Sequence, residues 1–282
     1  RPGVNQEITS YSNEGGWRDC DKIRFRFGYP EKIGGWEKFS SSTYLGSARA
    51  LHNWIALDGS NYLGVGTHLK YYIEEGGAFS DITPLRSTTS AGDVTFSATN
   101  GSTTITVSDT GHGAVENDFV TFSGAASLGG NITAAILNIE YQVVSIVDAN
   151  SYTITASVAA NSSDTGNGGS STVGAYQINV GLDSVVGGTG WGAGTWGRGG
   201  WGSAEPNGLT TTTEIRLWSH DNFGEDLLIN ARDAGIFYWD RTNNLSTRAI
   251  ELSTLSGTKR SVPTICKQIL VSDQDRHVIA FG

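Results

Sequence analysis

The chain has 282 residues and a formal net charge of −9, and its 38 glycines far outnumber its 5 prolines. This acidic balance argues against a protein that wraps nucleic acid by neutralising phosphates. No apolar run reaches the roughly 20 residues of a membrane-spanning helix, so we expect no membrane partner. Glycine, serine and threonine are abundant and long runs of helix-forming residues are missing, so we expect an all-β fold of short strands joined by turns.

The first strand pattern lies near the N-terminus. In residues 22–27, "KIRFRF", basic residues alternate with apolar ones, which predicts a strand with one basic and one apolar face. Gly28-Tyr29-Pro30 predicts the end of that strand. The basic face, formed by Lys22, Arg24 and Arg26, fits a phosphate or DNA contact. It equally fits a solvated face, or a face that pairs with acids on a neighbouring strand.

Residues 50–85 and 215–252 follow one pattern. A tryptophan, Trp54 or Trp218, precedes a polar turn, a short apolar strand, a second turn and an aromatic strand. We expect the apolar strands at Tyr62–Val65 and Leu227–Ile229, and the aromatic strands at Leu69–Ile73 and Ile236–Trp239. A third copy begins at Ile265. Repeats of about 40 residues built from strands and turns predict the blades of a β-propeller-type body, and a β-sandwich with similar hairpins is the alternative.

The middle of the chain differs in composition from both flanks. Between Ser87 and Gly197 there is no lysine or arginine, so this span carries −8 of the net charge. Its eight acids are Asp93, Asp109, Glu116, Asp118, Glu140, Asp148, Asp164 and Asp183. The acidic balance of the whole chain also suits a conduit that DNA passes without sticking, because like charges repel. The shift in composition indicates an inserted module.

Period-two alternation predicts that the inserted module is a small β-barrel or sandwich over residues 88–178. Strands are expected in "DVTFSA", "TITVSD", "NDFVTFSGA", "EYQVVSIVD" and "SYTITASVA", and a flexible return loop over residues 161–174. Residues 1–87 then form the first part of the propeller-type body. Residues 179–282 hold a glycine- and tryptophan-rich loop and the continuation of that body.

That loop, "GTGWGAGTWGRGGWGSA" at residues 188–204, places Trp191, Trp196 and Trp201 five residues apart among glycines. Burying one tryptophan yields about 2–3 kcal/mol, whereas ordering each glycine costs about 1–2 kcal/mol. The loop therefore needs its tryptophans as anchors. They fit pockets on the same subunit, pockets on a neighbouring subunit, or a stacking platform for sugar rings or bases.

The sequence shows no constellation for catalysis. The five histidines have no metal-ligand spacing, and there is no G-x-S-x-G elbow or phosphate-binding loop. We therefore predict no catalytic residues, no metal and no cofactor. Cys20 and Cys266 are expected to be two buried free thiols. The chain has no methionine and stops within a strand pattern, so we expect it to be a piece of a longer polypeptide.

Several blocks resemble one family of virion proteins. "PGVNQEITSYSNEGGWRDCDKIRFRFGYPEKIGGWEKF", "RLWSHDNFGEDLLINARDAGIFYWD" and "VSDQDRHVIAFG" resemble the bacteriophage proteins that build the tail hub or nozzle of short-tailed phages, the packaged-DNA stabilisation type. "GHGAVENDFVTFSGA" and "LNIEYQVVSIVDANSYTITA" resemble a β-module that is inserted in phage structural proteins. The inserted module departs from the minimal plan of the family.

This resemblance implies a non-enzymatic structural subunit of the virion tail. Six copies would form a ring below the portal and adaptor proteins, extend the DNA channel, and help to retain and release the packaged genome without sequence-specific DNA binding. The alternative is a receptor- or glycan-binding tail module, which would be monomeric and bind sugars. A glycan depolymerase is a more distant possibility.

Overall fold

The computed structural model describes residues 3–35, 37–180, 215, 217–255, 262–272 and 274–282. The chain divides into two compact units, residues 1–41 and residues 42–282. Both units are built from antiparallel strands, and the helices within the described residues are the short α1 (Ala134–Leu137) and the 3-10 turn η1 (Leu252–Thr254). The predicted all-β fold is therefore confirmed.

The N-terminal unit contains one hairpin, β1 (Ile23–Arg26) paired with β2 (Tyr29–Lys32). In β1 the apolar side chains are half-buried and the arginines are exposed, as the alternation predicts. The predicted end of the strand is wrong in one respect. The turn lies at Phe27-Gly28, and Pro30 is inside β2, opposite Phe25. Proline is tolerated there because β2 is an edge strand, whose outer N–H groups need no partner.

The body of the second unit contains two four-stranded sheets, each with its strands in chain order. The first sheet consists of β3 (Ala48–Ile55), β4 (Asn61–Thr67), β5 (Tyr71–Glu75) and β6 (Ala78–Asp81), and the second of β16 (Trp218–Phe223), β17 (Asp226–Ala231), β18 (Ile236–Trp239) and β19 (Ile250–Glu251). Both are up-and-down meanders, the form that the sequence repeat predicts for a blade.

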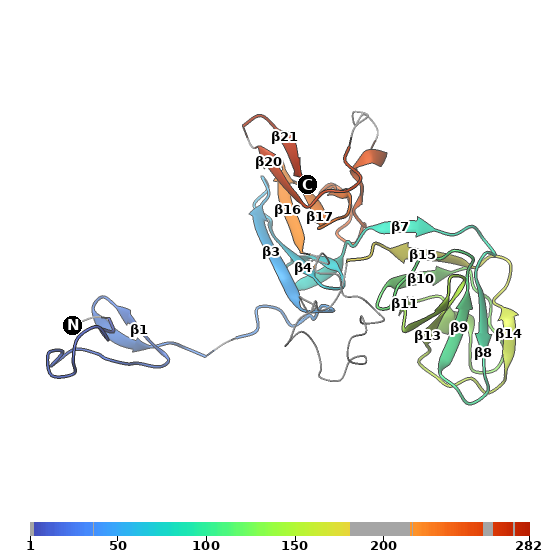
Figure 1. Cartoon of the computed structure of the whole chain (residues 1–282), viewed down its shortest axis with the longest axis horizontal. Coiled ribbons are helices and arrows are strands. Elements are labelled where there is room, and N and C mark those ends of the chain that lie inside the picture. Colours follow the sequence, from blue (N-terminus) through green and yellow to red (C-terminus); the bar gives the residue numbers. More distant parts are fainter. Residues whose placement is uncertain (1–2, 36, 181–214, 216, 256–261, 273) are drawn as a thin grey trace, which may run out of the picture. The chain divides into compact units, whose positions relative to one another are not determined.

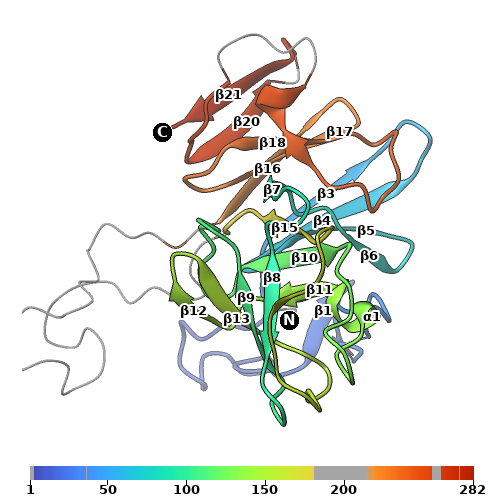
Figure 2. The same cartoon turned by 90° about the vertical axis from the view of Figure 1, so that its right-hand side faces the viewer.

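The two sheets and a two-stranded hairpin that follows them in the chain pack face to face. The hairpin joins β20 (Gln268–Ser272) to β21 (His277–Phe281) and lies against β16 (Figure 2). One apolar cluster joins the first sheet to the second and includes Trp54, Tyr71 and Trp239. Another cluster, with Leu228 and Ile269, joins the second sheet to the hairpin.

The second sheet therefore buries both of its faces. Leu227 and Ile229 of β17 belong to the cluster shared with the first sheet, and Leu228 between them belongs to the cluster shared with the hairpin. Its sequence, "DLLINA", is accordingly almost continuously apolar instead of alternating. Stacking of this kind is what a propeller requires, but the described residues do not form a closed ring of sheets, so the propeller stays a prediction.

The two repeat tryptophans do not occupy equivalent places. Trp54 lies near the end of β3 and pairs with Tyr62, whereas Trp218 begins β16 and pairs with Ala231. Both nevertheless enter the same apolar cluster. The two copies are therefore similar in sequence because both place aromatic side chains between the sheets. They do not align residue by residue.

The part of the chain that follows β6 and precedes β16 in the sequence forms a two-layered β-structure (Figure 1). One layer has the order β11-β10-β15-β7 and the other the order β12-β13-β9-β8-β14. Their bounds are β7 (Leu85–Thr88), β8 (Thr95–Ala98), β9 (Thr104–Ser108), β10 (Phe119–Ser123), β11 (Glu140–Gln142), β12 (Ser145–Asp148), β13 (Ser151–Thr155), β14 (Asp164–Asn167) and β15 (Val173–Gln177). The limits 88–178 remain a prediction of the domain boundary.

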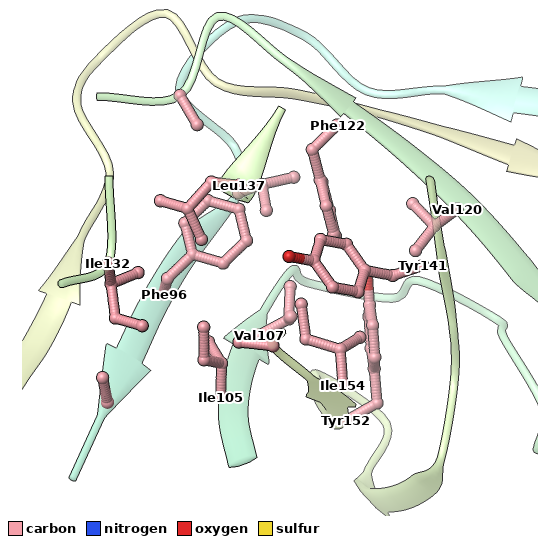
Figure 3. Close-up of a cluster of buried hydrophobic side chains, with 14 of the residues drawn as sticks. Phe96, Ile105, Val107, Val120, Phe122, Ile132, Leu137, Tyr141, Tyr152 and Ile154 are labelled. Atoms are coloured by element: carbon pink, nitrogen blue, oxygen red, sulfur yellow. The ribbon is translucent and has the colours of Figure 1, made fainter. Parts of the chain in front are cut away.

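The core of this module is made by the alternating residues that the sequence indicates. Phe96 and Val107 lie opposite each other on β8 and β9, and Phe122 meets Phe96 edge to face, with ring centroids 5.0 Å apart. Figure 3 shows these side chains converging with Tyr141 and Ile154. All five are buried, so one apolar cluster holds the two layers together.

Two local expectations in the module are wrong. The segment "EYQVVSIVD" forms two strands, β11 and β12, which belong to different layers. Residues 161–174 are not a structureless loop, because they contain β14, which pairs with β8. The strand "DTGN" is polar and sits at the edge of its layer. One of its positions is half-exposed and three are exposed, so there is no apolar alternation to detect.

Candidate functional site

The three loop tryptophans, Trp191, Trp196 and Trp201, lie outside the described residues. Their role as anchors stays a prediction. The other predicted site, the basic face of Lys22, Arg24 and Arg26, lies in the N-terminal unit and can be described in full.

The basic face is partly neutralised by acids. The Arg24 Nε atom lies 3.2 Å from Glu31 Oε2 on the paired strand β2, and Lys22 Nζ lies 3.6 Å from Asp21 Oδ2. Exposed pairs of this kind contribute little stability. They do reduce the net charge that a phosphate would meet, which favours the interpretation of a face that pairs with neighbouring acids.

The tip of this hairpin has an unusual backbone. Phe27 and Gly28 both have positive φ, 50° and 85°, which is the pattern of a type I′ two-residue turn. Asparagine and glycine prefer such positions, and a bulky residue there is an outlier. The Phe27 ring is 90% exposed, and the Arg26 guanidinium lies 5.5 Å from its centroid. Arg26, Phe27, Tyr29, Pro30 and Glu31 line an open surface depression of about 430 Å³.

An ionic network around one buried lysine joins the module to the body. Lys70, which precedes β5, is 3% exposed, and its ammonium group pairs with Asp81 at 2.7 Å and with Glu140 of the module. Arg248, which precedes β19, contacts the same two acids at 3.4 and 3.3 Å. Gln177 completes the network by donating to Glu140 at 2.7 Å. Both body sheets and the module therefore meet at one cluster of charges.

The electrostatics of this network favour the charged forms. Burial works to raise the pKa of Asp81, but the Arg248 and Lys70 cations outweigh it and lower that pKa below its usual value. The Lys70 ammonium also lies 4.5 Å from the centroid of the Phe119 ring on β10. A buried lysine with two carboxylates and an aromatic face is a well-satisfied charge, so we interpret this network as the mount of the module.

A second polar cluster lies between the two body sheets. His52 of β3 and His220 of β16 have ring centroids 4.8 Å apart. The His220 Nδ1 atom lies 2.9 Å from the Tyr71 hydroxyl, and His52 Nε2 lies 2.6 Å from Asn222 Oδ1. Burial, and then the neighbouring His52, lower the pKa of His220 to about 4. The neutral imidazole is thus the form that fits between the sheets.

Close to this cluster, Trp218 lies against the backbone of Gly66. The indole Nε1–H donates to the Thr67 carbonyl at 2.7 Å, and the ring packs edge to face on Tyr71 at 5.0 Å. A Cβ at residue 66 would lie 2.4 Å from Trp218 Cδ1. Here glycine lets a large aromatic side chain approach a strand closely.

The module encloses a third polar group. The Tyr176 hydroxyl donates to Asp109 Oδ2 at 2.6 Å, and the Tyr152 hydroxyl lies 2.9 Å from the Tyr176 hydroxyl. Burial raises the pKa of Tyr176 and of Tyr152. The Arg86 guanidinium lies 4.9 Å from the centroid of the Tyr176 ring, and its Nη2 donates to the His112 carbonyl at 2.9 Å. All these groups are satisfied within the module, which is the arrangement of a structural core.

Among the described residues no three histidine, cysteine or acidic side chains are placed to hold a metal ion. No helix in the part of the chain that the structure describes is long and apolar enough to cross a membrane. Cys266 is a buried free thiol, as expected, and donates weakly to the Ala234 carbonyl. Cys20 is also free but only half-buried.

Comparison with known proteins gives little. No family profile matches the sequence, and no curated protein matches it. A solved structure of the phage phi92 endosialidase aligns with 14% sequence identity over 79% of this chain and 32% of that chain, with a TM-score of 0.27. A TM-score this low does not establish a common fold.

Proposed function

We propose that this chain is a structural subunit of a bacteriophage tail, of the hub or nozzle type that the sequence blocks resemble. Six copies of it form a ring that continues the DNA channel below the portal and adaptor proteins. The ring helps to retain the packaged genome and to release it. Such a subunit acts by assembling with its neighbours. The buried polar groups described above serve the packing of the sheets and the attachment of the module to the body.

The observation that carries this proposal is the stack of sheets. The middle sheet is buried on both faces by its neighbours, so each added sheet extends the stack in one direction. The two end sheets still expose apolar side chains, Leu51 and Ile55 on the first and Leu270 and Ile279 on the last hairpin. Exposed apolar side chains on both ends of the stack support self-association and ring assembly.

The acidic charge supports the channel role in a narrower way than composition alone suggests. Of the eight acids, Asp93, Glu116 and Asp148 are exposed, whereas Asp109 and Asp118 are buried. Exposed carboxylates repel the phosphates of a DNA backbone. No step of the proposal needs the chain to bind DNA tightly.

Electron microscopy of the purified protein, alone and mixed with portal–adaptor complexes, tests the proposal. Rings that attach to the adaptor end are the expected result. A monomer that binds sugars on a glycan array would instead favour the receptor-binding alternative, and release of reducing ends would indicate a depolymerase. Trp196→Ala should weaken folding or ring assembly if the loop tryptophans are anchors.

A further inference from the structure

The tip of the N-terminal hairpin carries two features that cost free energy in water. Phe27 has a positive φ, which costs free energy for any residue with a Cβ, and its ring is almost fully exposed. Tyr29 beside it is 77% exposed. A two-stranded hairpin is at best marginally stable in water, so these exposed aromatic rings need a partner surface.

The composition of the tip indicates the kind of partner. Arg26, Phe27 and Tyr29 combine a cation with two aromatic rings, and arginine and aromatic residues dominate the centres of protein interfaces. The complementary surface is apolar with acids at its edge.

The second unit of the chain presents such a surface. Leu51 and Ile55 on β3, and Leu57 in the following turn, form an exposed apolar stripe, with Leu57 93% exposed. Acids lie at the Leu57 end of the stripe. The Leu57 N–H donates to Glu225 Oε1 at 2.6 Å, and Asp58 and Glu225 share a single cation, Arg241. This corner therefore keeps a net negative charge.

We propose that the hairpin tip of one copy docks on the apolar stripe of a second copy of the same chain. Phe27 packs on Ile55 and Leu57, and Arg26 pairs with the Asp58 and Glu225 carboxylates. The contact joins two different surfaces, so it repeats from copy to copy and closes into a ring or extends as a chain. The inference rests on the proposed assembly function and names the contact that carries it.

The test uses two interface variants of the full chain and a matched control for each. Phe27→Asn removes the ring but places Asn-Gly in the turn, the pair that type I′ turns prefer, so the hairpin keeps its fold. Leu57→Asp disables the stripe. Tyr11→Ala, an equally exposed aromatic residue of the same unit, and Val147→Asp, an exposed apolar position of the module, are the controls. Sedimentation velocity over a range of concentrations measures self-association.

The wild type and both controls should associate alike, and each interface variant should raise the dissociation constant by about 30-fold or more, as loss of an interface hot spot does. A mixture of Phe27→Asn and Leu57→Asp should form dimers that neither forms alone, because one intact tip meets one intact stripe. If both variants assemble like the wild type, the proposed contact is wrong while the assembly function stands. If the wild type stays monomeric at all concentrations, both are wrong.

Discussion

Replacing Gly66 by alanine tests the contact between the first two sheets directly. The Cβ that this change adds would lie 2.4, 2.6 and 2.9 Å from Cδ1, Cγ and Cβ of Trp218. Gly66 does not have a positive φ, so alanine causes no backbone strain, and the destabilising part of the effect comes from the collision. Trp218 is buried, packs on Tyr71 and donates to the Thr67 carbonyl, so the indole cannot move aside without losing contacts.

The expected cost follows from these contacts. Overpacking of a well-packed core costs about 1–3 kcal/mol, and loss of the indole hydrogen bond adds about 1 kcal/mol. Alanine returns about 0.4–1 kcal/mol through the lower entropy of the unfolded chain. We therefore expect Gly66→Ala to lower the free energy of unfolding by about 1–4 kcal/mol. The measurement is a denaturant titration followed by tryptophan fluorescence and circular dichroism.

Gly235→Ala is the matched control, because its added Cβ meets nothing closer than the Thr264 carbonyl at 3.5 Å. It should change the free energy of unfolding by less than about 1 kcal/mol. In the Trp218→Leu background the Gly66→Ala change should lose most of its cost, since the smaller side chain can avoid the new methyl group. Equal midpoints for Gly66→Ala and Gly235→Ala would show that Trp218 does not lie on Gly66 and would refute the reasoning.

Three further predictions concern the polar clusters. The folded-state pKa of His220 is about 4, against 6.5 ordinarily. As the pH falls, the unfolded chain therefore binds the proton first, and the free energy of unfolding should fall by about 3 kcal/mol between pH 6.5 and 4. Denaturant titrations at several pH values should show that the free energy of unfolding depends less steeply on pH in His220→Gln than in the wild type, and equal pH dependence would contradict this. Glu140→Gln should destabilise the module mount by about 1–3 kcal/mol, seen as earlier proteolysis or a separate calorimetric transition, whereas the exposed Glu116→Gln should change little. Tyr176→Phe removes the donor to buried Asp109 and should cost about 2 kcal/mol, while no loss would mean that Asp109 has another partner.

Sequence reasoning succeeded where one face of a strand is buried and the other is not. The alternation of Phe96, Ala98, Ile105 and Val107 placed β8 and β9, which the structure pairs with each other, because burial of one sheet face imposes a period of two. It failed where no face is apolar, as in β14. It also failed at Val143-Val144, where the apolar run continues while the chain passes from one layer to the other.

The polar clusters could not be predicted, because their members are far apart in the chain. Lys70 and Glu140 are separated by 70 residues, and Tyr71 and His220 by 149. The spacing of residues along the sequence cannot predict such distant pairs. One signal was available in retrospect, since "GVGTHLKYY" places a lysine between buried strands, and a lysine there requires an acid from elsewhere.

The missing cations of the inserted module can now be explained by position. Composition shows a span without lysine or arginine between Ser87 and Gly197. Yet Glu140 is paired with Lys70 and Arg248, and Asp118 lies 3.9 Å from Arg86. Lys70 and Arg248 come from the body, and Arg86 comes from β7, two residues before the predicted limit at residue 88. The module is therefore acidic partly because its flanks supply the counter-charges, and its charge asymmetry helps to hold it in place as well as to shape its surface. A module cut free of its flanks would keep its apolar core but leave Glu140 without either cation, so the ionic mount belongs to the whole chain and not to the insertion.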